Sequence, residues 1–277
     1  MADEVDGPRM GILQHIEEFR HRAKWSFITV MILFVFFSGF QARVADVGGV
    51  TVPYPYPDPL QPLASQFFNM TLNYLKPAFV VSTVLNPADA FIVQFKTAFF
   101  LALLVGMPMV AYQMGMFIAP GLRPREKRTI LRLLGPSMAL FALGVLIAFF
   151  VVLPFTFDFL YQVAVNLGVD QPMLHIDQFL DFVLLFMLGF GLAFQVPVIM
   201  YALTAVGLVR AATWRKYWRL AIIAIFGFGA IITPDGSGVT MVLVSAPMSV
   251  LYVAGYAACV LNERSRERRG RAPPREG

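Results

Sequence analysis

The sequence predicts an all-α, polytopic membrane protein with six transmembrane helices, and three observations lead to this fold class. Of the 277 residues, 58% are hydrophobic and 14% are charged, whereas a soluble domain carries about 25% charged residues. The mean hydropathy is +0.67. Several runs without charge reach the roughly 20 residues that cross the hydrocarbon core of a bilayer as a helix.

The expected spans follow one another from the N-terminus to residue 261. The first comes after a polar leader, whose residues 11–24 are expected to form a separate amphipathic helix at the membrane surface. Pro108 should kink the second span and Pro197 should break the fourth. The fifth span is short, at about 24 Å of helix. The six spans are residues 25–41, 91–117, 133–153, 179–203, 217–232 and 239–261.

The two long loops between spans have distinct compositions. In residues 42–90, prolines disfavour helix and favour extended backbone, and an amphipathic helix carrying Leu63, Phe67 and Leu75 is expected to follow them. Residues 154–178 carry aspartates and no Lys or Arg, so they are predicted to form an outer loop. The prolines are Pro53, Pro55, Pro57, Pro59 and Pro62.

Basic residues predict the orientation, because short cytoplasmic loops are enriched in Lys and Arg. Five of the 22 basic residues lie between the second and third spans, within 123–132, and only Arg43, Lys76 and Lys96 fall in predicted outer segments. Both termini are therefore expected in the cytoplasm, and Lys96 should snorkel to the interface. Residues 1–261 are predicted to form one membrane domain, and 262–277 a disordered basic tail at the inner membrane surface.

Several functional classes are disfavoured. The net charge of +5 does not point to nucleic acid, because the cations fall in alternate loops. The lone Cys259 allows no intrachain disulfide, and the histidines and the cysteine form no metal-ligand spacing, so we expect neither a metal nor a cofactor. The sequence contains no paired nucleophile and base of the kind that would indicate an enzyme. A secondary transporter of a small solute stays open as an alternative, although neither an internal repeat nor a charge near the middle of a span supports it.

Four ordered motifs resemble those of a known family. Residues 15–22 (HIEEFRHR) are similar to an HLxELRxR motif, 112–128 (YQMGMFIAPGLRPREKR) to YQxxxFxxPxLxxxERR, and 190–197 (FGLAFQVP) to FGxxFExPV. Thr233-Pro234-Asp235 and Ala246-Pro247 match the last two helices of the same family. This family is TatC, the multispanning subunit of the twin-arginine protein translocase, and the resemblance covers about residues 11–261.

The resemblance implies a non-enzymatic protein of the cytoplasmic (inner) membrane of a prokaryote, with six helices in a concave, glove-like arrangement. It implies binding of the twin-arginine signal peptides of folded cargo at the cytoplasmic face. It also implies a multi-copy complex with TatA and TatB, or with a bifunctional TatA-like protein, that uses the proton-motive force.

The resemblance also implies a set of signal-binding residues: Glu18, Arg20, Phe117, Glu126 and Arg128. Without the resemblance, Glu126 would be explained as a negative charge that interacts favourably with the helix dipole in the first turn after Pro124. Glu18 would be explained as a solvated surface residue. Within the motifs, both become carboxylates that accept guanidinium hydrogen bonds. Arg20 is expected to order the amino-terminal segment or to pair with Glu126 when cargo is absent, although positive-inside placement explains it equally well. Phe117 packs in the helix end or lies beside the signal.

A second group of residues is implied for partner contacts: Gln195, Thr233 and Asp235. Gln195 is a polar group at membrane depth, where the family usually has Glu. Glutamine does not titrate, which argues against a proton-linked role. It would bond either to TatA or TatB, or to another helix of this chain. Thr233 and Asp235 also suit a simple turn. Met241 and Val253 replace polar residues that are common in relatives, and Pro62, Pro120 and Pro197 are expected to be structural.

Overall fold

The computed structural model describes residues 12–47, 50–118, 124–169, 172–233 and 238–270. It confirms the all-α, polytopic membrane class. Five stretches are long and apolar enough to cross a membrane, and Trp218–Ile232 is a shorter apolar helix. The count of six spans and the orientation of the termini stay predictions. The five stretches are Ile16–Gly39, Asp89–Phe117, Leu131–Asn166, Ile176–Val206 and Gly238–Ser265.

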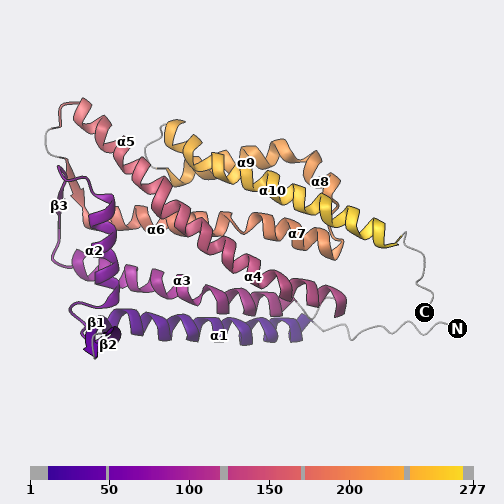
Figure 1. Ribbon diagram of the computed structural model, residues 1–277, viewed down its shortest axis with the longest axis horizontal. Coiled ribbons are helices and arrows are strands. Elements are labelled where there is room, and N and C mark those ends of the chain that lie inside the picture. The colour runs from indigo at the N-terminus through magenta and orange to yellow at the C-terminus, as the bar shows by residue number, and fades with distance from the viewer. Residues whose placement is uncertain (1–11, 48–49, 119–123, 170–171, 234–237, 271–277) are drawn as a thin grey trace. The chain divides into compact units, whose positions relative to one another are not determined.

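The chain forms two compact units (Figure 1). Unit 1 holds residues 1–123 and 161–184, and unit 2 holds 124–160 and 185–277. Helices α5 (Leu153–Asn166) and α6 (Ile176–Ala193) contribute residues to both units. The single membrane domain expected over residues 1–261 stays a prediction, since two compact units joined by continuous helices can belong to one domain.

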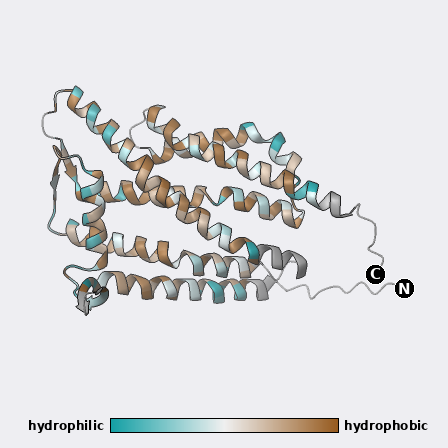
Figure 2. Ribbon diagram, viewed as in Figure 1, coloured by the Kyte–Doolittle hydropathy of each residue, from teal (hydrophilic) through white to brown (hydrophobic). Residues whose placement is uncertain are grey.

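Unit 1 is built on two long helices, α1 (Ile12–Gly39) and α3 (Asp89–Ile118), which run side by side. Gly106 permits close contact, because a methyl group there would lie 3.4 Å from Val30 and from Leu33. Figure 2 shows that the polar residues of α1 gather toward its N-terminal part. Helix α2 (Leu63–Leu75) packs against α3 and buries Phe68 and Leu75, as its amphipathic pattern predicts.

The expected surface helix 11–24 and first span 25–41 are not separate, which corrects the prediction. They form the single helix α1, because residues 12–38 contain neither Gly nor Pro to end it. Pro62 is buried at the N-cap of α2, and its carbonyl accepts the N–H of Gln66 at 3.1 Å. This placement agrees with its expected structural role.

The proline-rich segment is extended, as predicted, and belongs to a hairpin that the sequence did not reveal. Strand β1 (Phe40–Val47) pairs antiparallel with β2 (Val50–Pro57), with Phe40 opposite Pro57. The prolines of β2 occur at every second position. Since backbone N–H groups alternate in direction along a strand, these nitrogens belong on the side away from β1. The free edge of β2 therefore lacks three donors. A short parallel pair, β3 (Val81–Thr83) with β4 (Met173–His175), completes unit 1.

Unit 2 begins with α4 (Pro124–Ile147), which continues through a π-helical turn, Ala148–Val152, into α5. The helix does not end at Leu153, where the third span was predicted to end, but continues to Asn166 through the first half of the expected outer loop. The membrane boundary of this span stays a prediction. Pro154 does not break the helix, because the π turn directly before it changes the hydrogen-bond pattern where proline has no N–H to donate.

The fourth predicted span is interrupted, as expected from Pro197. Helix α6 ends at Ala193, and α7 (Val196–Val206) begins after a turn at Phe194 and Gln195. Pro197 lies in the first turn of α7, where its missing N–H costs little. Gly207, with φ of 86°, ends α7 in the left-handed conformation that suits glycine.

The remaining helices of unit 2 are α8 (Ala211–Lys216), α9 (Trp218–Ile232) and α10 (Gly238–Gly270). Helix α10 packs on α7, α8 and α9. The N–H of Ala211 donates to the Glu263 carboxylate at 2.7 Å, and the Tyr252 hydroxyl donates to the carbonyl of Trp214 at 2.8 Å. These bonds secure the short helix α8 to α10.

Close approach between helices in unit 2 depends on small residues, as is common in membranes. A methyl group at Gly144 of α4 would lie 2.8 Å from the carbonyl oxygen of Phe190 and 2.8 Å from Cγ of Phe194. Gly227 of α9 is exposed, and a methyl group there would meet nothing within 4 Å.

We expect Gly144→Ala to lower the free energy of unfolding by ~1–3 kcal/mol, the range for an overpacked core. Gly227→Ala is the control, and it should be neutral or stabilise the helix by up to ~1 kcal/mol. Thermal unfolding of both purified variants measures the difference. Equal melting temperatures would show that α4 does not pack as described.

Candidate functional site

A charged cluster joins α1 to α3 in unit 1. Arg22 donates to a single carboxylate oxygen of Glu18, Oε1, from Nε at 3.0 Å and from Nη2 at 2.6 Å. Its Nη1 donates across to Oε1 of Gln113 on α3 at 3.4 Å. The Glu18 and Arg22 side chains are only 17% and 20% exposed, and Gln113 is 9% exposed. Arg22 is therefore held between a carboxylate on its own helix, α1, and an amide on α3.

The second carboxylate oxygen of Glu18 differs from the first in its hydrogen bonding. Oε2 is buried and has no hydrogen-bond partner among the described atoms. A buried acceptor without a donor costs about 1–3 kcal/mol, and native structures contain few such groups. The site thus presents an acceptor whose orientation is set by Arg22 and which a further donor would stabilise.

An aromatic pair lies on the same two helices. The rings of Phe19 and Phe117 pack edge to face, with centroids 5.3 Å apart and planes at 64°, an arrangement that aromatic pairs favour. Phe19 remains 53% exposed. Phe117 therefore packs at the end of α3, as one of the two sequence interpretations held, and an apolar surface adjoins the Glu18 cluster along α1.

The other predicted signal-binding residues are less fully described. Arg20 is exposed on α1. Glu126 and Arg128 lie near the start of α4, in unit 2, and their side chains are outside the described part of the structure. Pro120 lies entirely outside the described residues. The common signal site formed by Glu18 and Glu126 stays a prediction.

Gln195 is bonded within unit 2. It occupies the N-cap of α7, its Oε1 accepts the Ser137 hydroxyl, and its Nε2 donates to the carbonyl of Ser137 at 3.1 Å. This is the bond between helices of the same chain that the sequence analysis left as one of two alternatives. Both groups of the amide are used, so the side chain joins α4 to α7.

The residues near the end of α9 differ in how much the structure describes. Thr233 is the C-cap, is buried, and donates its hydroxyl to the carbonyl of Gly229 at 2.9 Å. Asp235 lies outside the described residues. Val253 is exposed on α10, and Met241 is half-buried on the same helix.

The sequence analysis missed an ion-pair cluster in unit 1. Lys96 of α3 bonds to Asp177 at 2.8 Å and to Asp181 at 2.7 Å, both on α6. Lys96 was expected to snorkel to the interface, and the structure adds two carboxylate partners that were not predicted from the sequence. The sequence feature that could have predicted this cluster is the i,i+4 spacing of the two aspartates, which places both on one helix face. Gln113 and Arg22 were also missed, because the contact between them joins residues 91 positions apart.

The geometry contains no group of three or more His, Cys, Asp or Glu that could hold a metal within the part of the chain that the structure describes. What it does contain is a multi-pass helical membrane scaffold with a carboxylate, an arginine and two aromatic rings near the N-terminal end of α1 and the C-terminal end of α3. These features define the class as a multi-pass helical membrane protein.

Comparison with known proteins identifies the family. The model of the Sec-independent protein translocase protein (TatC) matches residues 14–247. The TatC protein of Cenarchaeum symbiosum is 37% identical over 93% of this chain and 97% of its own length, and that of Koribacter versatilis is 30% identical over 97% and 92%. The crystal structure of a twin-arginine translocase receptor, TatC, is 28% identical, has a TM-score of 0.71, and is matched over 90% of this chain and 99% of its own.

The chain therefore belongs to the TatC family. It is a multi-pass membrane subunit of the twin-arginine, or Sec-independent, protein translocase, and so a component of protein transport. This assignment favours protein translocation over the transport of a small solute.

We expect Ser137→Ala to destabilise unit 2 by about 0.6 kcal/mol, and at most ~1.7 kcal/mol, the measured range for hydrogen bonds between membrane helices. The variant removes the hydroxyl donor to Gln195. Ser249→Ala is the control, since that hydroxyl donates only within its own helix, to the carbonyl of Ser245. Unfolding of both variants in detergent provides the comparison, and equal stability would contradict the role of the Ser137 bond.

Proposed function

We propose that this subunit is the receptor for twin-arginine signal peptides, and that Glu18 accepts one arginine of the pair. The observation that supports the proposal is Oε2 of Glu18, which is buried and has no hydrogen-bond partner among the described atoms. A guanidinium offers five donors in a planar fork, so an incoming arginine can supply the missing hydrogen bond. Charge-assisted bonds of this kind are about twice as strong as neutral ones.

The neighbours of Glu18 prepare it for this role. Arg22 occupies Oε1 and leaves Oε2 free, and Gln113 on α3 anchors Arg22 from the opposite side. Because these bonds exist before the peptide arrives, little side-chain entropy is lost on binding. The Phe19–Phe117 pair adds an apolar surface that would pack against side chains next to the arginines.

Glu126, at the start of α4, is proposed as the second carboxylate, which accepts the other arginine of the signal. Arg128 follows it in the same turn of α4 and belongs to the same proposed site. Arg20 is proposed to order the amino-terminal segment, or to pair with Glu126 until cargo binds. The site would lie at the cytoplasmic face of the inner membrane of a prokaryote, with both termini on that side.

The partners are proposed to be TatA and TatB, or a bifunctional TatA-like protein, in a multi-copy complex that uses the proton-motive force. Thr233, Asp235 and Gln195 are the proposed contact residues. Since both amide groups of Gln195 bond to Ser137, a partner contact there would require exchange of those bonds. Gln195 has no proton to release, so proton coupling would involve other groups.

We expect Glu18→Gln and Glu126→Ala each to weaken binding of a twin-arginine peptide by ~1.5–3 kcal/mol, the range for hydrogen bonds to charged groups. Titration of the purified full chain with a labelled signal peptide measures this change. Glu17→Gln is the matched control, because Glu17 is exposed beside Glu18, and it should leave binding unchanged.

A peptide with paired lysines should bind the unaltered protein more weakly, since an ammonium lacks the planar fork. Photocrosslinking from positions 117 and 126 to a twin-arginine precursor gives an independent measurement. Undiminished binding to both glutamate variants, or labelling that persists with paired lysines, would overturn the proposed receptor site.

The short helix α9 suggests a second functional consequence. Its 15 residues span ~22 Å, less than the ~30 Å hydrocarbon core, so the bilayer must thin or flanking residues must compensate. We propose that α9 and α10 thin the membrane where TatA gathers.

Lengthening α9 by one turn of Leu and Ala should therefore lower export of a twin-arginine reporter and leave signal-peptide binding unchanged. Ile223→Leu with Ile231→Leu is the control, since it changes composition at two exposed positions without changing length. Full export by the lengthened protein would refute the thinning role.

A further inference from the structure

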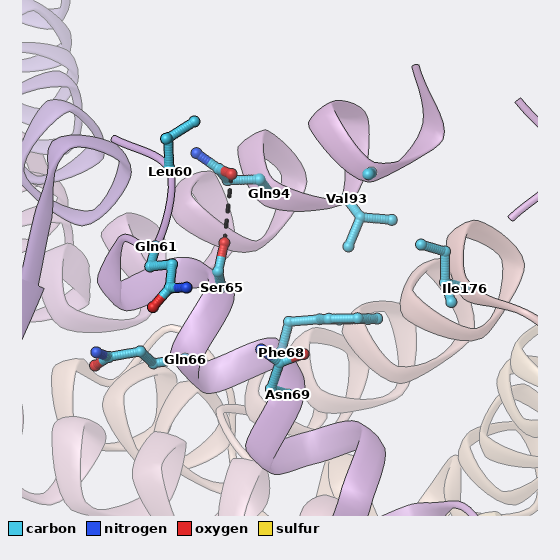
Figure 3. A pocket seen from close by; sticks show the side chains of 10 residues that line it. Leu60, Gln61, Ser65, Gln66, Phe68, Asn69, Val93, Gln94 and Ile176 are labelled. Atoms are coloured by element: carbon cyan, nitrogen blue, oxygen red, sulfur yellow. Dashed lines mark hydrogen bonds between the residues drawn. The ribbon is translucent and has the colours of Figure 1, made fainter. Parts of the chain in front are cut away.

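A pocket of about 400 Å³ lies in unit 1 between α2 with the loop before it and the first turns of α3 and α6 (Figure 3). This volume is in the range of small-molecule sites. One wall is polar and consists of amides and a hydroxyl, which both donate and accept hydrogen bonds. These polar residues are Gln61, Ser65, Gln66, Asn69 and Gln94.

The polar wall is held in place by its own bonds. Gln94 donates from Nε2 to the carbonyl of Pro59 at 3.0 Å, and its Oε1 accepts the hydroxyl of Ser65 at 3.3 Å, the bond drawn in Figure 3. The Asp58 carboxylate accepts the N–H groups of Leu60 and Gln61 at 3.1 and 3.2 Å. The wall is therefore largely formed before a ligand enters.

The opposite wall is apolar and well packed. Phe68, Val93 and Ile176 are all buried, and the ring of Phe68 lies edge to face against Phe179, with centroids 6.3 Å apart. A ligand that fits this pocket presents one face of C–H groups and an edge of hydroxyl or similar neutral groups.

The charge of the residues in and near the pocket limits the class of ligand further. None of the residues that line the pocket is charged. The nearby Lys96 is bound by Asp177 and Asp181, so that cluster carries a net negative charge. A phosphate would find no free cation among these groups, whereas an uncharged polyol satisfies the amides without any counterion.

The position along α3 indicates where the ligand comes from. The apolar stretch Asp89–Phe117 has 29 residues, or ~43 Å of helix, which matches a bilayer with its headgroup layers, ~40–45 Å, rather than the hydrocarbon alone. The pocket uses the first turns of this stretch, through Ala90, Val93 and Gln94. The charged Lys96 cluster, further along α3, also belongs near the interface, because ions avoid hydrocarbon. The pocket is thus at headgroup level.

From these observations we infer that the pocket binds the uncharged sugar headgroup of a glycolipid, in the leaflet that meets the N-terminal end of α3. The hydroxyls of the sugar would bond to Gln94 and Asn69, and its C–H face would lie on Phe68 and Ile176. This site is separate from the proposed signal site, so either proposal can fail without the other.

The test uses the full chain in phosphatidylcholine nanodiscs, with an environment-sensitive fluorophore on Leu60→Cys in a Cys259→Ala background. Leu60 lines the pocket and is 83% exposed, and Cys259 is the chain's single cysteine. Monoglucosyl diacylglycerol, added in increasing amounts, should give a saturable signal. Phosphatidylglycerol and sugar-free diacylglycerol should not.

Gln94→Leu and Asn69→Leu should each raise the half-saturating glycolipid fraction about tenfold, the change expected for one lost hydrogen bond. Gln178→Leu, at an exposed amide of α6 that does not line the pocket, is the matched control. If Gln94→Leu fails to fold, the exposed Asn69 decides the test alone. The proposal is overturned if all three lipids give the same response, if the Asn69 variant binds glycolipid normally, or if a photoreactive residue at position 69 labels a polypeptide instead of the glycolipid.

Discussion

The bond between Arg22 and one oxygen of Glu18 is the interaction on which the charged cluster of unit 1 depends. Among the described atoms, the second oxygen is left without a donor, and Arg22 reaches α3 through Gln113. That reach is possible only because α1 and α3 lie close together, with Gly106 against Val30 and Leu33 and with Phe19 against Phe117. The packing of α1 on α3 and the orientation of the Glu18 carboxylate are therefore coupled. A change in the contact between these helices is expected to alter that orientation.

Polar groups in apolar surroundings are stabilised by partners that the protein supplies. Oγ1 of Thr71, Oγ1 of Thr156 and Nδ2 of Asn262 have none among the described atoms, but several others do. Gln195 bonds to Ser137, the hydroxyl of Thr97 to the carbonyl of Val93, and that of Thr233 to the carbonyl of Gly229. The glutamine that replaces the usual glutamate of the family is thus accommodated by a neutral bond between α4 and α7. In this chain the position stabilises the scaffold, whether or not it also meets a partner subunit.

Features encoded locally could be predicted from the sequence. Apolar runs gave the membrane class, amphipathic spacing gave α2, Pro197 gave the break before α7, and alternate prolines gave an extended segment. The errors had both local and longer-range causes. Pro154 is tolerated by the π turn before it, and the polar leader joins the first span because no residue breaks α1. Contacts across 58 to 91 positions, such as Gln195 with Ser137 and Arg22 with Gln113, depend on how helices pack. Periodicity does not contain that information. The motifs singled out Glu18, Phe117, Glu126 and Arg128, and the signal-site role of all four stays a prediction.

The alternating prolines of β2 have a consequence for neighbouring copies of the protein. An exposed strand edge normally invites another strand to join it, and this is how sheets grow between molecules. Pro53, Pro55 and Pro57 have no backbone N–H, so another strand would find no donors at these positions on that side. A second copy of the protein that meets this edge of β2 would therefore not extend it into a shared sheet.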